Sequence, residues 1–316
     1  MIGIIMNNIS NAWAVIVPLI VILIIGVIFR YKRIISPQGI KDIRAIIINI
    51  CLPAIIFSAF YKVEYNTNLA VMTIVIFSVN LGLLFLGFAA NKLFRINKAI
   101  MPFLTAGFET GMIGYPLFAL LFGPENLGYY AAMDFGHSIF VFSICWTFLR
   151  IKNDPDTKVL KTLKNTVTMP PIIAMIAGII FGMTGLGRMI DNSQVGGIIS
   201  SVISFMSAPA AALILIVIGY GIEISRPILK IAMKTILVRI VLLMALGLLA
   251  YIVLNLLIPM NNLAKWAYII FFIMPPAFGI SIIHQKEEDQ KYMATLLSIY
   301  SLISFAAYLI LTFQVF

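Results

Sequence analysis

Two apolar stretches of the chain are interrupted by glycine and proline at matching places, GMIGYP at residues 111–116 and MPPAFG at residues 274–279. Glycine loosens an α-helix, and proline removes one of its backbone donors. Inside a membrane, a helix that loses hydrogen bonds is tolerated only where the freed groups are buried in protein or face a water-filled cavity. Paired interruptions of this kind are typical of the binding site of a secondary transporter.

The composition of the whole chain is that of a membrane protein. Of its 316 residues, 62% are hydrophobic and 11% are charged, and the mean hydropathy is +1.06. Soluble domains carry about 25% charged residues. Apolar segments that can cross a membrane are predicted at residues 12–29, 43–60, 68–91, 99–122, 128–150, 169–184, 197–220, 231–256, 266–284 and 292–315. We therefore expect an all-α membrane protein with ten transmembrane helices and no separate soluble domain.

The basic residues divide unequally between the two sides of these segments. Nineteen of the 22 lysines and arginines fall in or beside the odd-numbered loops, and only Lys62, Arg188 and Lys265 fall on the other side. The positive-inside rule then places the odd loops in the cytoplasm and both termini outside the cell's inner (plasma) membrane. The net charge of +10 lies at the membrane edges, where anionic lipid is the expected partner, and we discount nucleic acid.

The positions of proline and glycine indicate an internal repeat. Pro18 precedes Gly26 by eight residues, and Pro170 precedes Gly178 by the same eight. Five segments per half is an odd number, so the second half must enter the membrane from the opposite side, which predicts an inverted repeat. The predicted units are the first five-helix repeat at 1–150, a cytoplasmic linker at 151–168 and the second repeat at 169–316.

Five motifs carry a resemblance to a known family: NICLPA (49–54), GFETGMIGYPLFALLFG (107–123), PPIIAMIAGIIFG (170–182), SAPAAALILIVIGYGI (207–222) and MPPAFGISII (274–283). With them the sequence resembles the auxin efflux carrier family, which includes bacterial malate permease-like proteins, over essentially the whole chain. The resemblance implies the bile-acid sodium symporter type of fold, with a scaffold of spans 1, 2, 6 and 7 and a moving transport unit of spans 3, 4, 5, 8, 9 and 10. It also implies that helices four and nine break and cross at their prolines, beside the substrate. A homodimer through the scaffold helices would likewise resemble the family.

Two residues depart from the family pattern. Glu109 stands where the family usually has asparagine in span four, and Gly279 stands where it often has asparagine in span nine. The identity of the substrate therefore does not transfer with the resemblance. Glu109 is an ionisable group in an otherwise uncharged span, and such groups are candidates for function because they are costly to bury. Burial disfavours the charged form, which suits a proton carrier, whereas the structural alternative is a carboxyl hydrogen-bonded to unwound backbone.

Other polar residues inside the spans allow more than one interpretation. Asp134 and His137 are three residues apart on span five, so they share one helical face. The two residues could relay protons or orient a water molecule, or they could form a structural pair whose hydrogen bonds are satisfied. Both interpretations stay open for Asp134, and for His137 we favour the structural one. Arg239 lies near the predicted cytoplasmic end of span eight and is expected to snorkel to the surface instead of binding substrate. Asn80 and Asn255 are expected to form hydrogen bonds between helices.

The candidate substrate site follows from the two interruptions. The second half of each broken helix begins with free N–H groups and the positive end of a dipole, so two such ends meeting at a crossing can bind a carboxylate. Tyr115 and Ser281 would add hydroxyl donors, and Asn49 joins the site through the resemblance. The predicted substrate-binding residues are Asn49, Glu109, Thr110, Gly114, Tyr115, Pro116, Pro275, Pro276, Gly279 and Ser281, and the predicted proton-coupling residues are Glu109 and Asp134. No metal site and no cofactor is predicted.

We therefore expect a secondary active or potential-driven permease that moves a small organic anion, with a carboxylate as the first choice, by alternating access and with proton coupling through Glu109. A sodium- or cation-coupled symporter of the bile-acid symporter type is the alternative, and a channel or membrane receptor ranks behind both. An enzyme is not expected, because neither Gly-x-Ser-x-Gly nor His-Glu-x-x-His occurs in the sequence. A Walker A sequence is also missing, which excludes ATP-driven transport by this chain alone.

Overall fold

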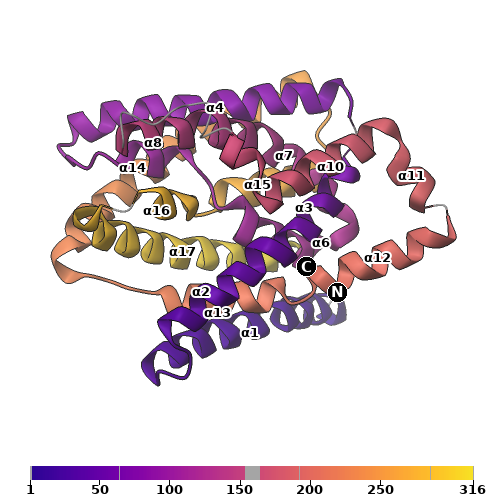
Figure 1. Cartoon of the computed structure of the whole chain (residues 1–316), viewed down its shortest axis with the longest axis horizontal. Coiled ribbons are helices and arrows are strands. Elements are labelled where there is room, and N and C mark those ends of the chain that lie inside the picture. Colours follow the sequence, from indigo (N-terminus) through magenta and orange to yellow (C-terminus); the bar gives the residue numbers. More distant parts are fainter. Residues whose placement is uncertain (1, 64, 154–163, 192, 285, 316) are drawn as a thin grey trace.

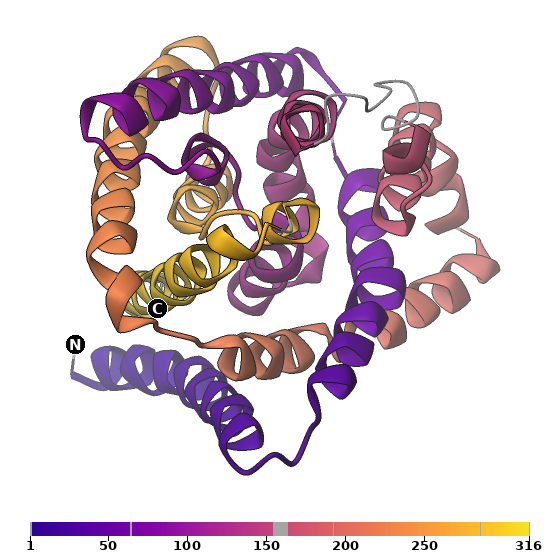
Figure 2. The same ribbon diagram turned by 60° about the vertical axis from the view of Figure 1, so that its left-hand side comes forward.

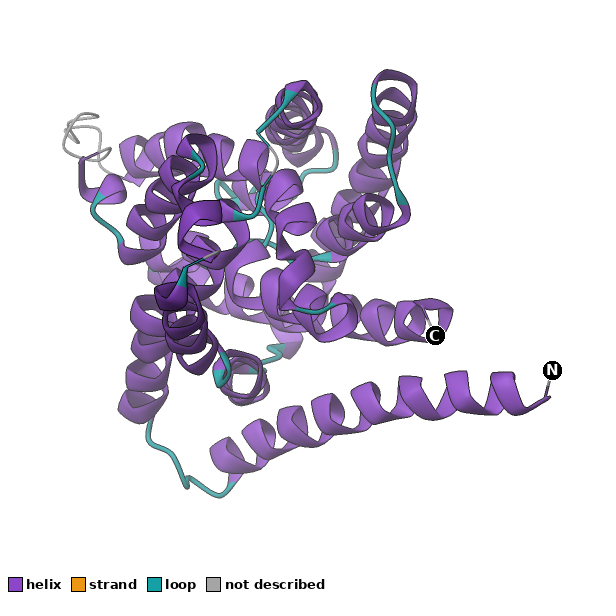
Figure 3. Ribbon diagram, turned by 90° about the vertical axis from the view of Figure 1, so that its right-hand side faces the viewer, coloured by secondary structure: helices purple, strands orange, loops and turns teal. Residues whose placement is uncertain are grey.

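The computed structural model describes residues 2–63, 65–153, 164–191, 193–284 and 286–315. This part of the chain consists of helices and connecting loops, without a strand (Figure 3). Eight helical segments in it are long and apolar enough to cross a membrane, which is the architecture of a multi-pass membrane protein. They are Ala12–Tyr31, Pro37–Tyr61, Thr67–Leu93, Met101–Phe122, Pro124–Asn153, Gly196–Gly221, Arg226–Leu257 and Glu287–Val315.

The other two predicted segments form shorter helices. The sixth corresponds to α10 (Pro170–Thr184), and the ninth is divided into α15 (Asn262–Ile273) and α16 (Gly279–Ile283). Of the predicted linker 151–168, residues 154–163 lie outside the described residues. The remaining helices are α1 (Ile2–Tyr31), α2 (Pro37–Ile46), α3 (Leu52–Tyr61), α4 (Thr67–Leu93), α5 (Met101–Ala106), α6 (Tyr115–Phe122), α7 (Leu127–Phe140), α8 (Trp146–Asn153), α11 (Leu186–Asp191), α12 (Gln194–Ser207), α13 (Ala210–Gly221), α14 (Arg226–Leu257) and α17 (Glu287–Val315).

The helices are arranged as two walls with a middle layer between them (Figure 1). α1 lies along α13 and α3 lies along α10, whereas α4 packs against α5, α7 and α14. Figure 2 shows α17 and the broken helices between the wall of α4 and α14 and the wall of α1, α13 and α3. One continuous cluster of buried apolar side chains connects the middle layer to both walls. The two helix breaks therefore lie inside the protein and not at its lipid-facing surface.

Glycines allow two helix pairs to approach closely. In the pair of α1 and α13, a Cβ atom on Gly26 would overlap the carbonyl group of Ile216. In the pair of α10 and α3, a Cβ atom on Gly178 would collide with the backbone of Phe57 and the side chain of Phe60. Small residues at such crossings let the backbones of membrane helices meet. The two glycines marked by the proline–glycine spacing thus have the same packing role in the two halves of the chain.

Two prolines follow wide helical turns and do not break their helices. Pro53 lies in the first turn of α3, after the π-helical turn Ile47–Cys51, and Pro116 lies in the first turn of α6, after the π-helical turn Thr110–Gly114. A proline ring crowds the carbonyl group four residues earlier, and a wider i→i+5 turn moves that group away. The helix therefore continues through both prolines.

Candidate functional site

The break in helix four lies before the position that the sequence predicted. α5 ends at Ala106, Gly107 has extended backbone angles (φ −100°, ψ 151°), and the helix resumes after Glu109. The prediction of a break at Gly114–Pro116 is wrong, because the π-helical turn accommodates Pro116. Gly114 has a different role: a Cβ atom there would collide with the ring of Tyr130.

The break in helix nine overlaps the predicted interruption. α15 ends at Ile273, the following residues 274–278 are not helical, and α16 begins at Gly279. Pro275 and Pro276 both lack a backbone N–H group, so neither can donate to a carbonyl group of the preceding turn. Two prolines in succession stop the helix where one proline at residue 116 does not.

Glu109 connects the two breaks directly. Its backbone N–H group donates to the carbonyl oxygen of Pro275 at 2.8 Å. Its carboxylate accepts the N–H group of Phe278 at 2.6 Å and the N–H group of Met112 at 3.1 Å, so that it caps the start of both second half-helices. The side chain is only 8% exposed. The sequence predicted that N–H groups at the two breaks would bind the carboxylate of a substrate. In the structure the carboxylate of Glu109 accepts hydrogen bonds from these groups instead.

His137 holds the unwound backbone of helix four from the side. Its Nε2 atom accepts the backbone N–H group of Phe108 at 3.0 Å, and its Nδ1 atom lies 2.9 Å from Oδ1 of Asp134. A backbone N–H group can only donate, so Nε2 carries no proton and Nδ1 donates to the carboxylate. This network assigns His137 as neutral. The placement agrees with the structural role favoured for this residue.

Asp134 is the centre of a buried hydrogen-bond network. Besides His137, it accepts the hydroxyl group of Tyr115 at 3.0 Å and that of Ser138 at 3.1 Å. Three donors satisfy its carboxylate, which is the arrangement expected of a buried charge. The hydroxyl group of Tyr115 is thereby directed to Asp134 and not toward a substrate.

A cavity of about 160 Å³ lies against the crossing of the two breaks. Glu109, Thr110 and Gly279 belong to its wall, together with apolar side chains of α3, α8, α10 and the π-helical turn Val141–Cys145 and the polar side chains of Asp134, His137 and Ser138 on α7. Arg44, on α2, is the one permanent cation in the described part of this wall. The four ion pairs of the described residues do not include it. Sequence reasoning counted Arg44 only as a loop charge and so missed it as a site residue.

A second cavity of about 180 Å³ lies on the other side of Phe278 and Arg44, which contribute to the walls of both cavities. Ser281 lines this second cavity, and its hydroxyl group donates to the carbonyl oxygen of Phe278 at 2.7 Å. Arg44 therefore lies between two cavities, both of which reach the helix crossing.

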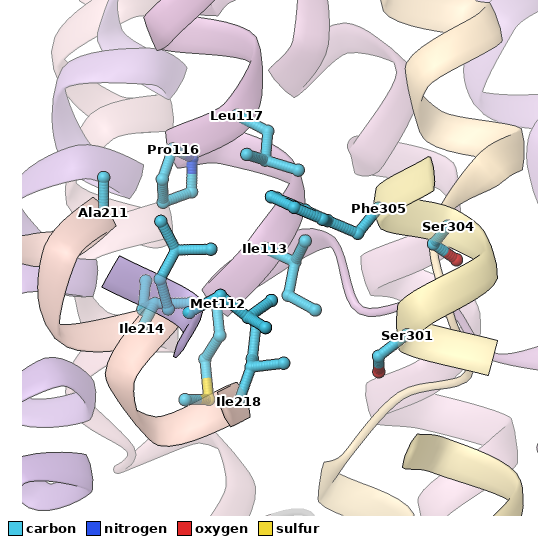
Figure 4. A pocket seen from close by; sticks show the side chains of 12 residues that line it. Met112, Ile113, Pro116, Leu117, Ala211, Ile214, Ile218, Ser301, Ser304 and Phe305 are labelled. Carbon is cyan, nitrogen blue, oxygen red and sulfur yellow. The ribbon is translucent and has the colours of Figure 1, made fainter. Parts of the chain in front are cut away.

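A narrow apolar crevice separates the second half of helix four from α13 and α17 (Figure 4). Pro116 lines it, away from the two larger cavities. On the α17 side it is lined by Ser301 and Ser304, whose buried hydroxyl groups have no hydrogen-bond partner among the residues that the structure describes. The hydroxyls three and six residues before Ser301 do have partners: Ser298 accepts the N–H group of Glu223, and Thr295 accepts that of Ser225. We call these four regularly spaced residues of α17, namely Thr295, Ser298, Ser301 and Ser304, the hydroxyl ladder.

Asn49 does not join the other candidate residues. It lies on an exposed face of the π-helical turn after α2, and its amide group donates to the carbonyl oxygen of Ala45 at 2.8 Å. Asn80 and Asn255 also donate within their own helices, to Ile76 and Tyr251 respectively, so the hydrogen bonds expected between helices are not formed. An asparagine in a helix has a carbonyl partner available one turn earlier, and sequence spacing alone does not rank that partner against a neighbouring helix.

Arg239 lies at the helix crossing, and the prediction that it snorkels is wrong. Its side chain is 1% exposed, and its guanidinium group donates to the carbonyl oxygens of Leu104 and Met274. It also lies over the rings of Phe108 and Tyr300, at 4.8 and 5.1 Å from their centroids. Leu104 and Met274 are near the ends of the first half-helices α5 and α15, where the dipole is negative, so a cation is stabilised there. Glu109 and Arg239 thus cap opposite ends of the same two breaks.

Comparison with known proteins supports the general class. No family model matches the chain. Over 210 residues the chain is 23% identical to a protein of Methanothermobacter thermautotrophicus described as an uncharacterized transporter, an alignment that covers 63% of this chain and 64% of that protein. The chain thus matches less than two thirds of the length of this relative. Together with the apolar helices, the similarity supports a transporter-like membrane protein.

Proposed function

We propose that the chain is a secondary transporter that works by alternating access at the cavity beside Glu109. The observation that carries the proposal is the bridge between two broken helices, made by one acidic side chain that also faces an internal cavity. Broken helices that meet at a buried cavity are the usual construction of a transporter site. The distant similarity to a transporter is consistent with it.

The close pairs of α1 with α13 and of α3 with α10 support the finer architecture. They link the first span to the seventh and the second to the sixth, as two inverted repeats with a common scaffold require. We therefore propose the arrangement implied by the auxin efflux carrier family: ten spans, a scaffold of spans 1, 2, 6 and 7, both termini outside the plasma membrane, and a scaffold-mediated homodimer.

The charge distribution of the cavity favours a small organic anion with an apolar part. Arg44 supplies a positive charge that has no ion-pair partner in the described part of the chain, and most of the wall is apolar. A carboxylate substrate would be attracted to that charge and would place its carbon skeleton against the wall. The carboxylate of Glu109 opposes such a substrate while it is charged, which makes its protonation a means of coupling.

Protonation of Glu109 would change more than the charge of the cavity. A carboxylate accepts hydrogen bonds through both oxygens, and a protonated carboxyl group accepts less strongly. The bonds to Phe278 and Met112 would weaken, so the proton state of Glu109 would control how tightly the two breaks are held together. A cation-coupled symporter is the second candidate, because the same buried carboxylate would attract a cation to the crossing.

Uptake into proteoliposomes tests the proposal. Labelled mono- and dicarboxylates are supplied while pH, sodium and membrane potential gradients are imposed one at a time. We expect saturable uptake of at least one carboxylate that is stimulated by a proton gradient. Stimulation by sodium alone would select the cation-coupled alternative, and a folded protein that moves no carboxylate under any gradient would refute the proposed function.

A further inference from the structure

Two N–H groups of residues that line the cavity beside Glu109 lack an acceptor in the described part of the chain. They are Nε of Arg44 and Nε1 of Trp146; both atoms are buried and have no hydrogen-bond partner in the described part of the chain. Buried polar groups in folded proteins are nearly always paired, so an unpaired donor needs an explanation. Two such donors in one cavity indicate a missing acceptor.

The indole of Trp146 is held in place by its neighbours. Trp146 begins α8, and its ring packs edge-on against that of Phe142, with centroids 4.9 Å apart and planes at 89°. A Cβ atom on Gly279 would lie 2.8 Å from Cζ2 of Trp146, so the absence of a side chain at residue 279 leaves the space that the indole fills. The Nε1 donor is therefore positioned before any ligand arrives, which lowers the entropic cost of binding.

The two carboxylates in the wall of this cavity already accept hydrogen bonds. The carboxylate of Glu109 is bonded to Phe278 and Met112. That of Asp134, in the same wall, accepts hydrogen bonds from Tyr115 and Ser138 and lies 2.9 Å from Nδ1 of His137. The N–H groups of Arg44 and Trp146, by contrast, have no acceptor among the described residues.

We propose that Arg44 and Trp146 bind the oxygen atoms of the transported anion, each donating from its own wall of the cavity. The inference rests on the proposed function and names the residues and the ligand chemistry: a carboxylate or a similar oxyanion attached to an apolar group. Arg44 belongs to the second span and Trp146 to the fifth. The bound anion therefore forms a bridge between a helix assigned to the scaffold and a helix assigned to the transport unit.

The test measures binding of acetate, benzoate and succinate to the purified full-length protein in detergent by isothermal titration calorimetry, with benzyl alcohol as the neutral counterpart of benzoate. For the carboxylates that bind, Arg44→Gln should lower the affinity about tenfold or more, and Trp146→Phe about fivefold, since a hydrogen bond to a charged group is worth more than a neutral one. Arg44→Lys should retain part of the affinity because it keeps the charge. Lys41→Gln, on an exposed face of the same helix, and Trp266→Phe are matched controls and should bind as the wild type does.

Fluorescence gives a second measurement that does not depend on transport. The chain has three tryptophans, so Trp13→Phe with Trp266→Phe leaves Trp146 as the sole indole. Benzoate should change its emission, and benzyl alcohol should not. Wild-type affinity in both Arg44→Gln and Trp146→Phe, or a wild-type protein that binds none of the three carboxylates, would overturn the pair. If vesicles take up a carboxylate but Arg44→Gln and Trp146→Phe bind it with wild-type affinity, only the assignment of these two residues is refuted. If carboxylates bind through the two residues but vesicles show no uptake, only the proposed function is refuted.

Discussion

The backbone N–H group of Phe278, in the break of helix nine, donates a 2.6 Å hydrogen bond to the carboxylate of Glu109, in the break of helix four. The return contact runs from the N–H group of Glu109 to the carbonyl oxygen of Pro275. Two unwound segments, 169 residues apart in the chain at the first of these bonds, are thereby fastened to each other. Each of the following expectations depends on this junction or on the packing that supports it.

Glu109→Gln should destabilise the protein by about 1–3 kcal/mol, the cost of leaving one buried partner unsatisfied. The amide keeps one acceptor oxygen but presents its NH2 group to a backbone donor, so one of the two caps is lost. Thermal unfolding in detergent measures the effect. Glu287→Gln, at an exposed position, is the control and should unfold like the wild type. An unchanged midpoint in Glu109→Gln would mean that the junction does not depend on this carboxylate.

The pH response of uptake should also depend on Glu109. Protonation removes the negative charge that opposes an anion in the cavity, so transport of a carboxylate should rise as the pH falls through the titration of Glu109. Glu109→Gln and Glu109→Asn cannot titrate there and should show uptake that varies little with pH. Initial rates of carboxylate uptake, measured from pH 5 to pH 8 at constant membrane potential, test this expectation. A normal pH profile in both variants would move the coupling site elsewhere, with Asp134 the next candidate.

Arg239→Gln should be destabilising, by about 1–3 kcal/mol or more, because it leaves the buried carbonyl oxygens of Leu104 and Met274 without their donor. The shorter side chain of glutamine also loses the contacts that the guanidinium group makes with the ring faces of Phe108 and Tyr300. Denaturant or thermal unfolding of the purified variant gives the magnitude. The exposed Arg226→Gln provides a charge-matched control within about 0.5 kcal/mol of the wild type. Equal effects of the two substitutions would argue against a role of Arg239 at the crossing.

Gly26→Ala and Gly178→Ala should each cost about 1–3 kcal/mol, because the new methyl group meets backbone that has little room to shift. Gly197, on α12, has open space around the same position, so Gly197→Ala should be neutral or stabilising by up to about 1 kcal/mol. Melting temperatures of the three variants separate close packing from helix propensity. Tolerance of Ala at both Gly26 and Gly178 would show that the helix pairs can separate.

Part of the fold could be predicted because a membrane-spanning helix needs a long run of apolar residues, which is visible in the sequence. Long apolar runs predicted the positions of the spanning helices, and Pro275 followed by Pro276 predicted the break in helix nine. The break in helix four was misplaced, because whether a single proline interrupts a helix depends on the turn before it. The turn Thr110–Gly114 is π-helical, and no residue type in it signals that geometry.

Among the charged residues of the site, one could also be found from the sequence and others could not. Glu109 could be found because an acid alone in an apolar span is conspicuous. Arg239 could not be placed, because α14 begins at Arg226, so that Arg239 is 13 residues, about 20 Å, inside the helix and not near its end. Arg44 and Trp146 were missed because what marks each of them is a buried N–H group without an acceptor. That is a property of the packed structure and not of the sequence.

The hydroxyl ladder of α17 sets a step length for sliding. Its members recur every three residues, about 4.5 Å along a helix, and two of the four now accept the N–H groups of Glu223 and Ser225 beyond the end of α13. Three residues turn an α-helix by about 300°, so a shift of α17 by one such interval toward its own N-terminus would bring Ser301 and Ser298 to those same two N–H groups only together with a rotation of about 60° about the helix axis. Intermediate positions would leave the N–H groups facing the gaps between hydroxyls. A displacement of α17 that keeps both N–H groups paired would therefore combine stepwise sliding with rotation of the helix.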